Sequence, residues 1–156
     1  MSGAFYSISI PTHTGTLYDT ASTPFSCTTI TNTGLAVARL LSPQQVAYTA
    51  NKQIFLSDFA TTPRIILAEI EKQLDTQFKM ERKESGPVLQ RLREEVEEDW
   101  EKAYELLALT FVADVGKEMG YDFEATGKEI WNARLGLPVV TLKEVVTEAI
   151  KNTKGL

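Results

Sequence analysis

The alternation of helix-like and strand-like segments between residues 32 and 80 constrains the fold of this chain most strongly. The stretches 32–41 (NTGLAVARLL) and 61–74 (TTPRIILAEIEKQL) have the apolar spacing of amphipathic helices. The stretches 51–59 (NKQIFLSDF) and 77–80 predict short strands. Because this alternation is typical of α/β proteins, we expect an α/β fold. It would be an α+β-like lobe with few short strands and about four to five helices.

Residues 1–31 are a loop-rich lead-in within a single domain that spans 1–156. Side chains alternate over 5–10, which predicts one strand with a buried even-numbered face. From Pro11 onward Thr, Ser, Gly and Pro dominate, and only 25–30 has the composition of a further strand.

Capping residues place the ends of the first two helices. Asn32 is the predicted N-cap of the first helix, and Ser42-Pro43 ends it, because proline disfavours helical backbone in the residue before it. Thr61 or Thr62 caps the second helix. Pro63 then takes the first helical position, where its missing N–H costs nothing.

The C-terminal half is predicted to be rich in helix. After Gly86-Pro87, residues 88–109 carry apolar side chains three and four positions apart. The acidic residues between Glu94 and Glu101 are accompanied by no histidine, so we interpret them as a solvated helix face rather than a metal site.

Two further helices are predicted near the end of the chain. The first, over 110–118, is expected to end at Gly116 or Gly120. The sequence TLKE at 141–144 has the spacing of a capping box and predicts a last helix over 141–150.

Composition excludes several classes of protein. The net charge of −5, with no basic run, argues against a nucleic-acid-binding surface. A single cysteine, Cys27, cannot form an internal disulfide and favours a reducing compartment. No apolar stretch is long enough to cross a membrane, and the N-terminus lacks the pattern of a signal peptide. We therefore expect a cytoplasmic protein.

Motifs for catalysis are sparse. The sequence has no glycine-rich dinucleotide fingerprint, no Walker loop and no cluster of metal ligands, so we predict no cofactor-binding or metal-binding residue. His13 is interpreted as a loop imidazole, with a role in acid catalysis or substrate contact as the alternative. Cys27 is interpreted as a small packed residue. Tyr48 and Lys52 match the Tyr-x-x-x-Lys spacing of short-chain dehydrogenases, but no helix is predicted there and we attribute the match to chance.

Several segments between residues 22 and 150 together resemble one family. Residues 31–41 are similar to its D-I-G-x-A-V-A-x-x-L helix, with Asn32 where Asp is usual. Residues 42–57 resemble its P-E-x-x-x-N-x-x-v-x-i-s turn and strand, and 62–72 its T-x-x-e-i-l-x-x-l-E-K helix. Further similar segments are 78–80 (FKM), 121–123 (YDF) and 135–138 (LGLP). On these segments the chain resembles the C-terminal half of NmrA-like and isoflavone-reductase-like proteins. Asp75 departs from the glycine usual in the family.

The resemblance implies a relationship to atypical short-chain dehydrogenases. In that family an N-terminal Rossmann half holds NADP(H) and the catalytic lysine, and a smaller lobe covers the substrate. The glycine-rich loop, the phosphate-binding basic residue and the lysine have no counterpart here. NADP(H) is therefore implied by the family although its binding motif is absent, and the catalytic residues stay unknown.

Two classes of function follow from the resemblance. In the first, the chain is the substrate lobe of an NAD(P)H-dependent oxidoreductase of secondary metabolism. This enzyme would reduce an aromatic or polyketide-like small molecule. Its partners would be that molecule and either a separate Rossmann-domain chain or a second copy. In the second, it is a non-enzymatic NmrA-like regulatory or binding module; a truncated, inactive remnant is a third reading. Aromatic side chains in loops are the candidate substrate-binding residues, with core packing as the alternative for each. These are Phe5, Tyr6, Tyr18, Phe25, Phe59 and Phe123.

Overall fold

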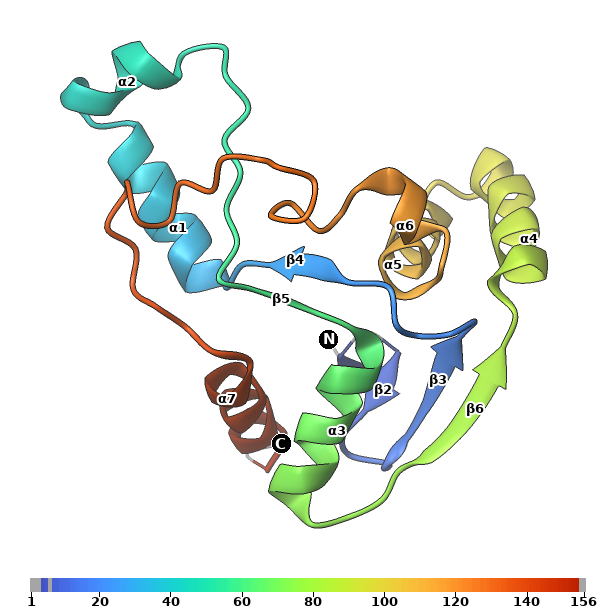
Figure 1. Ribbon diagram of the computed structural model, residues 1–156. Helices are drawn as coiled ribbons and strands as arrows, with labels where there is room; N and C mark the ends of the chain where they lie inside the picture. Colours follow the sequence, from blue (N-terminus) through green and yellow to red (C-terminus); the bar gives the residue numbers. More distant parts are fainter. Residues whose placement is uncertain (1–3, 6, 155–156) are drawn as a thin grey trace.

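The computed structural model describes residues 4–5 and 7–154, which form a mixed α/β fold with two small sheets (Figure 1). The larger sheet has the order β1-β2-β3-β6. β1, β2 and β3 pair antiparallel in turn, and β6 joins β3 in parallel. These strands are β1 (Ala4–Phe5), β2 (Ile8–Ser9), β3 (Thr14–Tyr18) and β6 (Lys79–Lys83).

Gly15 in β3 allows its neighbours to approach closely. A Cβ at this position would lie 2.8 Å from the carbonyl oxygen of Ser7 and 2.8 Å from the Cε atom of Met80. The absence of a side chain therefore lets the backbone of Ser7, directly before β2, approach β3 closely.

The smaller sheet pairs β4 (Phe25–Cys27) with β5 (Phe59–Thr61) in antiparallel orientation. Within the described residues every strand ends at or before Lys83 and the later elements are helices, so the C-terminal half is rich in helix, as predicted. The helices are α1 (Ile30–Leu40), α2 (Pro43–Thr49), α3 (Pro63–Leu74), α4 (Ser85–Glu98), α5 (Lys102–Val112), α6 (Gly116–Met119) and α7 (Leu142–Lys154).

The main hydrophobic core lies between the larger sheet, α3 and α7, which run side by side in Figure 1. Its buried members come from β2, β4, α3 and α7 and from the turns beside them. They are Ile8, Ile10, Phe25, Ile66, Ile70, Phe78, Val146 and Ile150. Burying such side chains stabilises the fold by about 1.5–3 kcal/mol each.

Two smaller cores lie at opposite ends of the molecule. The antiparallel helices α4 and α5, which we call the α4–α5 hairpin, bury a cluster of Leu89, Leu92, Leu109, Val112 and Ala113. At the other end α1 packs against the segment before α7 through Ala36, Trp131, Leu135 and Leu137.

The N-terminal caps of α3 and α7 are those predicted from the sequence. Thr62 accepts a hydrogen bond from the N–H of Ile65, and Pro63 is the first residue of α3. The hydroxyl and N–H of Thr141 both donate to Glu144, and the N–H of Glu144 donates to Thr141 Oγ1, which is the predicted capping box.

The first helix begins earlier than predicted. Thr29, not Asn32, is the N-cap of α1, and its hydroxyl accepts from the N–H of Asn32. The helix ends before Ser42 as expected, but Pro43 then starts α2, because proline suits a first helical position as well as it ends a preceding helix.

The strand predicted over 51–59 is wrong for most of its length. Asn51 has a left-handed φ of 60°, and up to residue 58 the segment forms only an isolated bridge between Phe55 and Ile130. The N–H groups of Ser57 and Asp58 bond to the side chain of Asn132 and the carbonyl of Cys27. The backbone donors that would build a longer ladder therefore have other acceptors.

The lead-in is more ordered than its composition predicts. The strand expected over 5–10 is two short strands, because Ser7 has a φ of 69° between them. On the expected buried face Ile8 and Ile10 are buried, and Tyr6 lies outside the described residues. The region after Pro11 contains β3, which threonine-rich composition concealed.

The helix predicted over 88–109 is interrupted near its middle. Asp99 adopts an extended backbone and accepts a hydrogen bond from the N–H of Glu101, so α4 ends and α5 begins. Aspartate favours this local turn over helix continuation. The next segment is α6, which Gly116 begins and Gly120, with a φ of 66°, ends.

Candidate functional site

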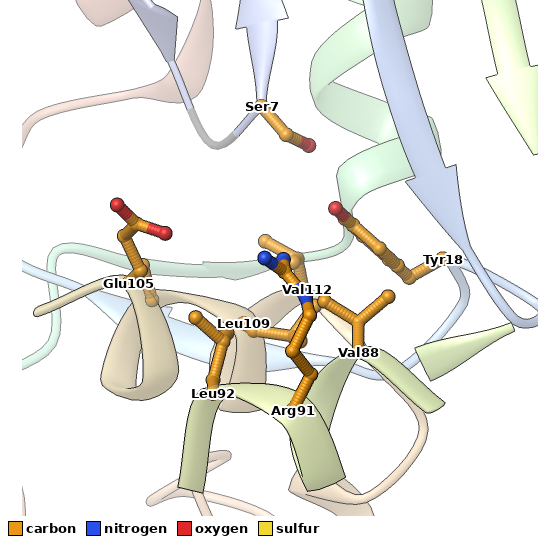
Figure 2. Close-up of a pocket in the computed structure, with 9 residues that line it drawn as sticks. Ser7, Tyr18, Val88, Arg91, Leu92, Glu105, Leu109 and Val112 are labelled. Atoms are coloured by element: carbon orange, nitrogen blue, oxygen red, sulfur yellow. The ribbon is translucent and has the colours of Figure 1, made fainter. Parts of the chain in front are cut away.

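A cavity of about 250 Å³ lies between β3 and the α4–α5 hairpin (Figure 2). Apolar side chains form most of its wall, and polar groups stand at its mouth. The lining residues are Ser7, Tyr18, Val88, Arg91, Leu92, Glu105, Ala108, Leu109 and Val112.

The cavity exists because the hairpin is held beside the sheet at its ends. Asp19, directly after β3, accepts hydrogen bonds from the N–H and hydroxyl of Ser85 at 2.8 and 2.6 Å, and from the N–H of Asp114 at 3.0 Å. Ser85 begins α4 and Asp114 follows α5. One carboxylate thus joins both ends of the hairpin to the sheet, and Tyr18 next to it faces the gap.

A second carboxylate continues this junction. Asp114 accepts hydrogen bonds from the hydroxyls of Thr20 and Thr23 and pairs with Lys117 at 3.2 Å. Partial burial raises the pKa of each carboxyl, but the hydrogen bonds to Asp19 and Asp114 outweigh burial and lower both pKa values. Both groups are therefore ionised at neutral pH.

The polar groups at the cavity mouth suit ligand binding. Figure 2 shows the Tyr18 hydroxyl, the Arg91 guanidinium and the Glu105 carboxylate directed toward the same open space. Arg91 pairs with Glu95 at 2.9 Å, and Glu105 pairs with Lys102 at 2.8 Å. Each of these two charges therefore has an ion-pair partner that does not line the cavity. The described lining residues offer hydrogen-bond donors, an acceptor and an apolar wall.

Of the six aromatic residues predicted to bind substrate, Tyr18 lines this cavity. Phe25 is 1% exposed in the main core, edge-on to Phe111. Phe59 is half-buried in β5, and Phe123 packs on Phe55 with ring centroids 5.1 Å apart.

The remaining two aromatic predictions lie at the start of the chain. Phe5 belongs to β1, and Tyr6 lies outside the described residues. The structure thus brings one predicted residue to the cavity and distributes the others among separate contacts.

The other candidates from the sequence lie apart from the cavity. His13 is exposed, with its ring centroid 5.1 Å from that of Phe78. Cys27 is half-buried in β4. Tyr48 is in α2, which ends at Thr49 before Lys52, so the two residues do not share a helical turn as the dehydrogenase motif requires.

The cavity residues of α4 and α5 were not predicted as site residues. The apolar spacing over 88–109 identified Leu92 as part of a packed face, but it did not separate side chains that fill the core from those that line a gap. That distinction depends on the break at Asp99 and on the Asp19 contacts, which join residues far apart in the sequence.

A second polar cluster surrounds Asp58. Its Oδ1 accepts from the amide groups of Asn32 and Asn132 at 2.7 and 2.8 Å. Its Oδ2 accepts from the N–H and hydroxyl of Thr29 at 2.8 and 3.0 Å. The Asn32 amide also donates to the carbonyl of Pro138, so this cluster joins three segments that are distant in the sequence.

The strand–helix junctions before α1 and α3 do not fit a dinucleotide. At the N-terminus of α1 the Asp58 carboxylate holds the position a phosphate would take, and its charge would repel one. At the N-terminus of α3, Pro63 has no N–H and the N–H of Ile65 is bonded to Thr62. No step involving NADP(H) follows from these residues.

Comparison with models of known families, with curated proteins and with solved structures finds no match for this chain. Within residues 4–5 and 7–154, no helix is long and apolar enough to span a membrane. The same residues contain no group of three or more His, Cys, Asp or Glu side chains placed to hold a metal ion.

Proposed function

We propose that this chain is a small-molecule-binding lobe related to NAD(P)H-dependent oxidoreductases of the NmrA-like and isoflavone-reductase-like type. Its part is to hold an aromatic or polyketide-like substrate, in the cytoplasm, while the cofactor and the reducing step belong to a Rossmann domain on another chain. The observation that carries the proposal is the cavity between β3 and the α4–α5 hairpin.

The chemistry of the cavity supports an aromatic ligand. Val88, Leu92, Leu109 and Val112 provide apolar walls, and binding sites of this kind combine such walls with a few polar groups that orient the ligand. An apolar cavity of about 150 Å³ is enough for benzene. A volume of about 250 Å³ therefore suits one substituted ring, or one end of a larger polyketide.

The segments that carry the family resemblance also support the proposal. Residues 31–41 and 42–57 are consecutive, and both are far from 135–138 in the sequence. The Asp58 cluster joins them: Asn32 contributes its amide to Asp58 and Pro138, and Ser57 donates its N–H to Asn132. Motifs that form one hydrogen-bonded unit are expected to occur together.

A second candidate is the non-enzymatic binding module. It is favoured by the N-termini of α1 and α3, where the groups that could hold a phosphate already bond within the chain. Both candidates use the same cavity. They differ in whether a Rossmann chain, added with NADPH, turns the bound ligand over.

Binding is tested by isothermal titration calorimetry with 4-hydroxyacetophenone as the probe. We expect saturable one-to-one binding. Ala108→Phe should weaken it at least about tenfold, because the new ring enters the cavity from an exposed position. Tyr18→Phe should weaken binding about fivefold through loss of one hydrogen bond.

The matched control is Ala68→Phe, which adds the same ring to an exposed site on α3 and should leave the affinity unchanged. Equal affinity in Ala108→Phe and the wild type would contradict the assignment of the cavity. In parallel, titration with NADPH followed by cofactor fluorescence should show no saturable binding. Tight NADPH binding would contradict a lobe without a cofactor site.

A further inference from the structure

Helix α5 exposes a large apolar face. Trp100, Tyr104 and Leu107 are 68%, 69% and 52% exposed, and their spacing of four and three residues places them on one side of the helix and its preceding turn. The rings of Trp100 and Tyr104 are in edge contact, with centroids 6.2 Å apart. We call these three residues the α5 face.

The α5 face is not the side that packs in the hairpin. Leu109 and Val112 of the same helix are buried against α4. Met119 of α6 is also exposed, at 48%, and its sulfur accepts from the Tyr121 hydroxyl beside Thr110. A helix apolar on opposite sides is typical of one covered on both, and exposed apolar patches mark interaction sites.

The end of α4 and the turn that leads into the α5 face are strongly acidic, and we call them the acidic border. Residues 91–105 contain seven carboxylates against three basic side chains. Two of these three, Arg91 and Lys102, already pair with Glu95 and Glu105. Within the described part of the chain the other five carboxylates form no ion pair. They are Glu94, Glu97, Glu98, Asp99 and Glu101.

The negative charge of these carboxylates indicates which kind of partner can bind the α5 face. A second copy of the chain would bring the same carboxylates against one another, and an anionic lipid surface or a nucleic acid would be repelled in the same way. A partner with lysine or arginine beside an apolar ridge satisfies both features, since the ridge covers the aromatic side chains and the cations meet the carboxylates.

We propose that the α5 face docks a basic amphipathic helix of a protein partner, with Trp100 and Tyr104 as the apolar anchors and the acidic border setting the choice of partner. Aromatic residues are enriched among the anchors of interfaces. The face adjoins the ligand cavity through Ala108, which is exposed and lines it, so a docked helix would lie beside the cavity mouth.

The probe is a synthetic 18-residue amphipathic helix made of leucine and lysine, compared with the same peptide carrying glutamate for lysine. Trp100 reports directly: being exposed, it should shift its emission to the blue and lose acrylamide quenching on binding, whereas Trp131, 6% exposed, should change little. Trp100→Phe should abolish the fluorescence change. We expect the lysine peptide to bind and the glutamate peptide not to bind.

Variants separate the apolar from the charged contribution. By fluorescence anisotropy of a dye-labelled lysine peptide, Tyr104→Ser with Leu107→Ser should weaken binding at least about tenfold. Glu97→Lys with Glu98→Lys should weaken it and reduce its salt dependence. The controls are Tyr48→Ser on α2 and Glu148→Lys on α7, both at exposed positions, which should bind as the wild type.

Three results would overturn the proposal. These are binding of the glutamate peptide as tightly as the lysine peptide, unchanged affinity in the Tyr104/Leu107 variant, and concentration-dependent dimerisation of the wild type that this variant abolishes. The last result, from sedimentation equilibrium, would make a second copy the occupant. Circular dichroism of each variant should match the wild type, as expected for exposed positions.

Discussion

The side-chain amide of Asn32 donates hydrogen bonds to two buried acceptors. It is 1% exposed and donates to both Asp58 and the carbonyl of Pro138. In this chain an aspartate at position 32 would face the Asp58 carboxylate with no proton to donate.

We therefore predict that Asn32→Asp lowers the free energy of unfolding by about 2–4 kcal/mol at pH 7, because it buries a second carboxylate beside the first. The like charge raises the pKa of the new carboxyl above its unfolded value. Its destabilisation should then be largest at neutral pH and fade as the pH falls and the group is protonated. Urea unfolding at pH 7 and pH 5 measures this. Asn152→Asp, at an exposed position, should show neither effect.

Asp75 shows that a departure from an expected residue can keep the local geometry. Glycine is the usual residue where a helix ends in the left-handed conformation, and Asp75 ends α3 in that conformation with a φ of 49°. Aspartate tolerates this region better than most residues, so the turn between α3 and β6 forms without glycine.

Among the elements, α7 shows how local signals and packing combine. Its capping box was predicted from spacing, and the hydrogen bonds from Thr141 lower the pKa of Glu144. Its position depends on Val146 and Ile150, which pack in the main core beside α3.

We predict that Thr141→Ala destabilises the protein by about 1 kcal/mol, because the N–H of Glu144 loses its acceptor. Glu144→Gln should cost less, since glutamine still offers an acceptor to the N–H of Thr141. Thermal unfolding followed by circular dichroism ranks the two variants. A larger loss in Glu144→Gln than in Thr141→Ala would show that charge, not the hydrogen-bond pattern, stabilises this end of the helix.

For the whole molecule, the contacts of Asp19 and Asp114 join the sheet to the α4–α5 hairpin. The pKa of each carboxyl is lower in the folded state, so each group stabilises the fold above its unfolded pKa of about 3.9. This contribution is lost as the pH falls through the lower, folded values. Their mutual repulsion and the Asp114–Lys117 pair modify the pKa values but not this direction.

We expect the free energy of unfolding to decrease as the pH is lowered from 5 to 2. The backbone amides of the α4–α5 hairpin should lose their protection from hydrogen exchange before those of the main core do. Asp19→Asn should flatten the decrease, because the amide carries no charge to lose. Hydrogen–deuterium exchange with mass spectrometry at pH 5 and pH 3 follows both regions. Simultaneous opening of the hairpin and α7 would contradict this order.

Sequence periodicity and capping alone determined much of the secondary structure. They predicted α1, α3, the α7 capping box, the helix-rich C-terminal half and the mixed α/β class, because these depend on side chains within a few residues of one another. They missed three features. β3 depends on pairing with a distant strand, α2 on proline starting a helix, and the break at Asp99 on a local hydrogen bond to its side chain.

Only the tertiary structure decided where the cavity and the exposed apolar face lie. The cavity wall joins Tyr18 to Leu109, and the Asp19 contacts that hold it open join residues of three elements. The exposure of Trp100 likewise depends on which side of α5 meets α4. Helical spacing shows that a side is apolar, but whether that side is buried, lines a gap or stays exposed depends on packing between distant segments.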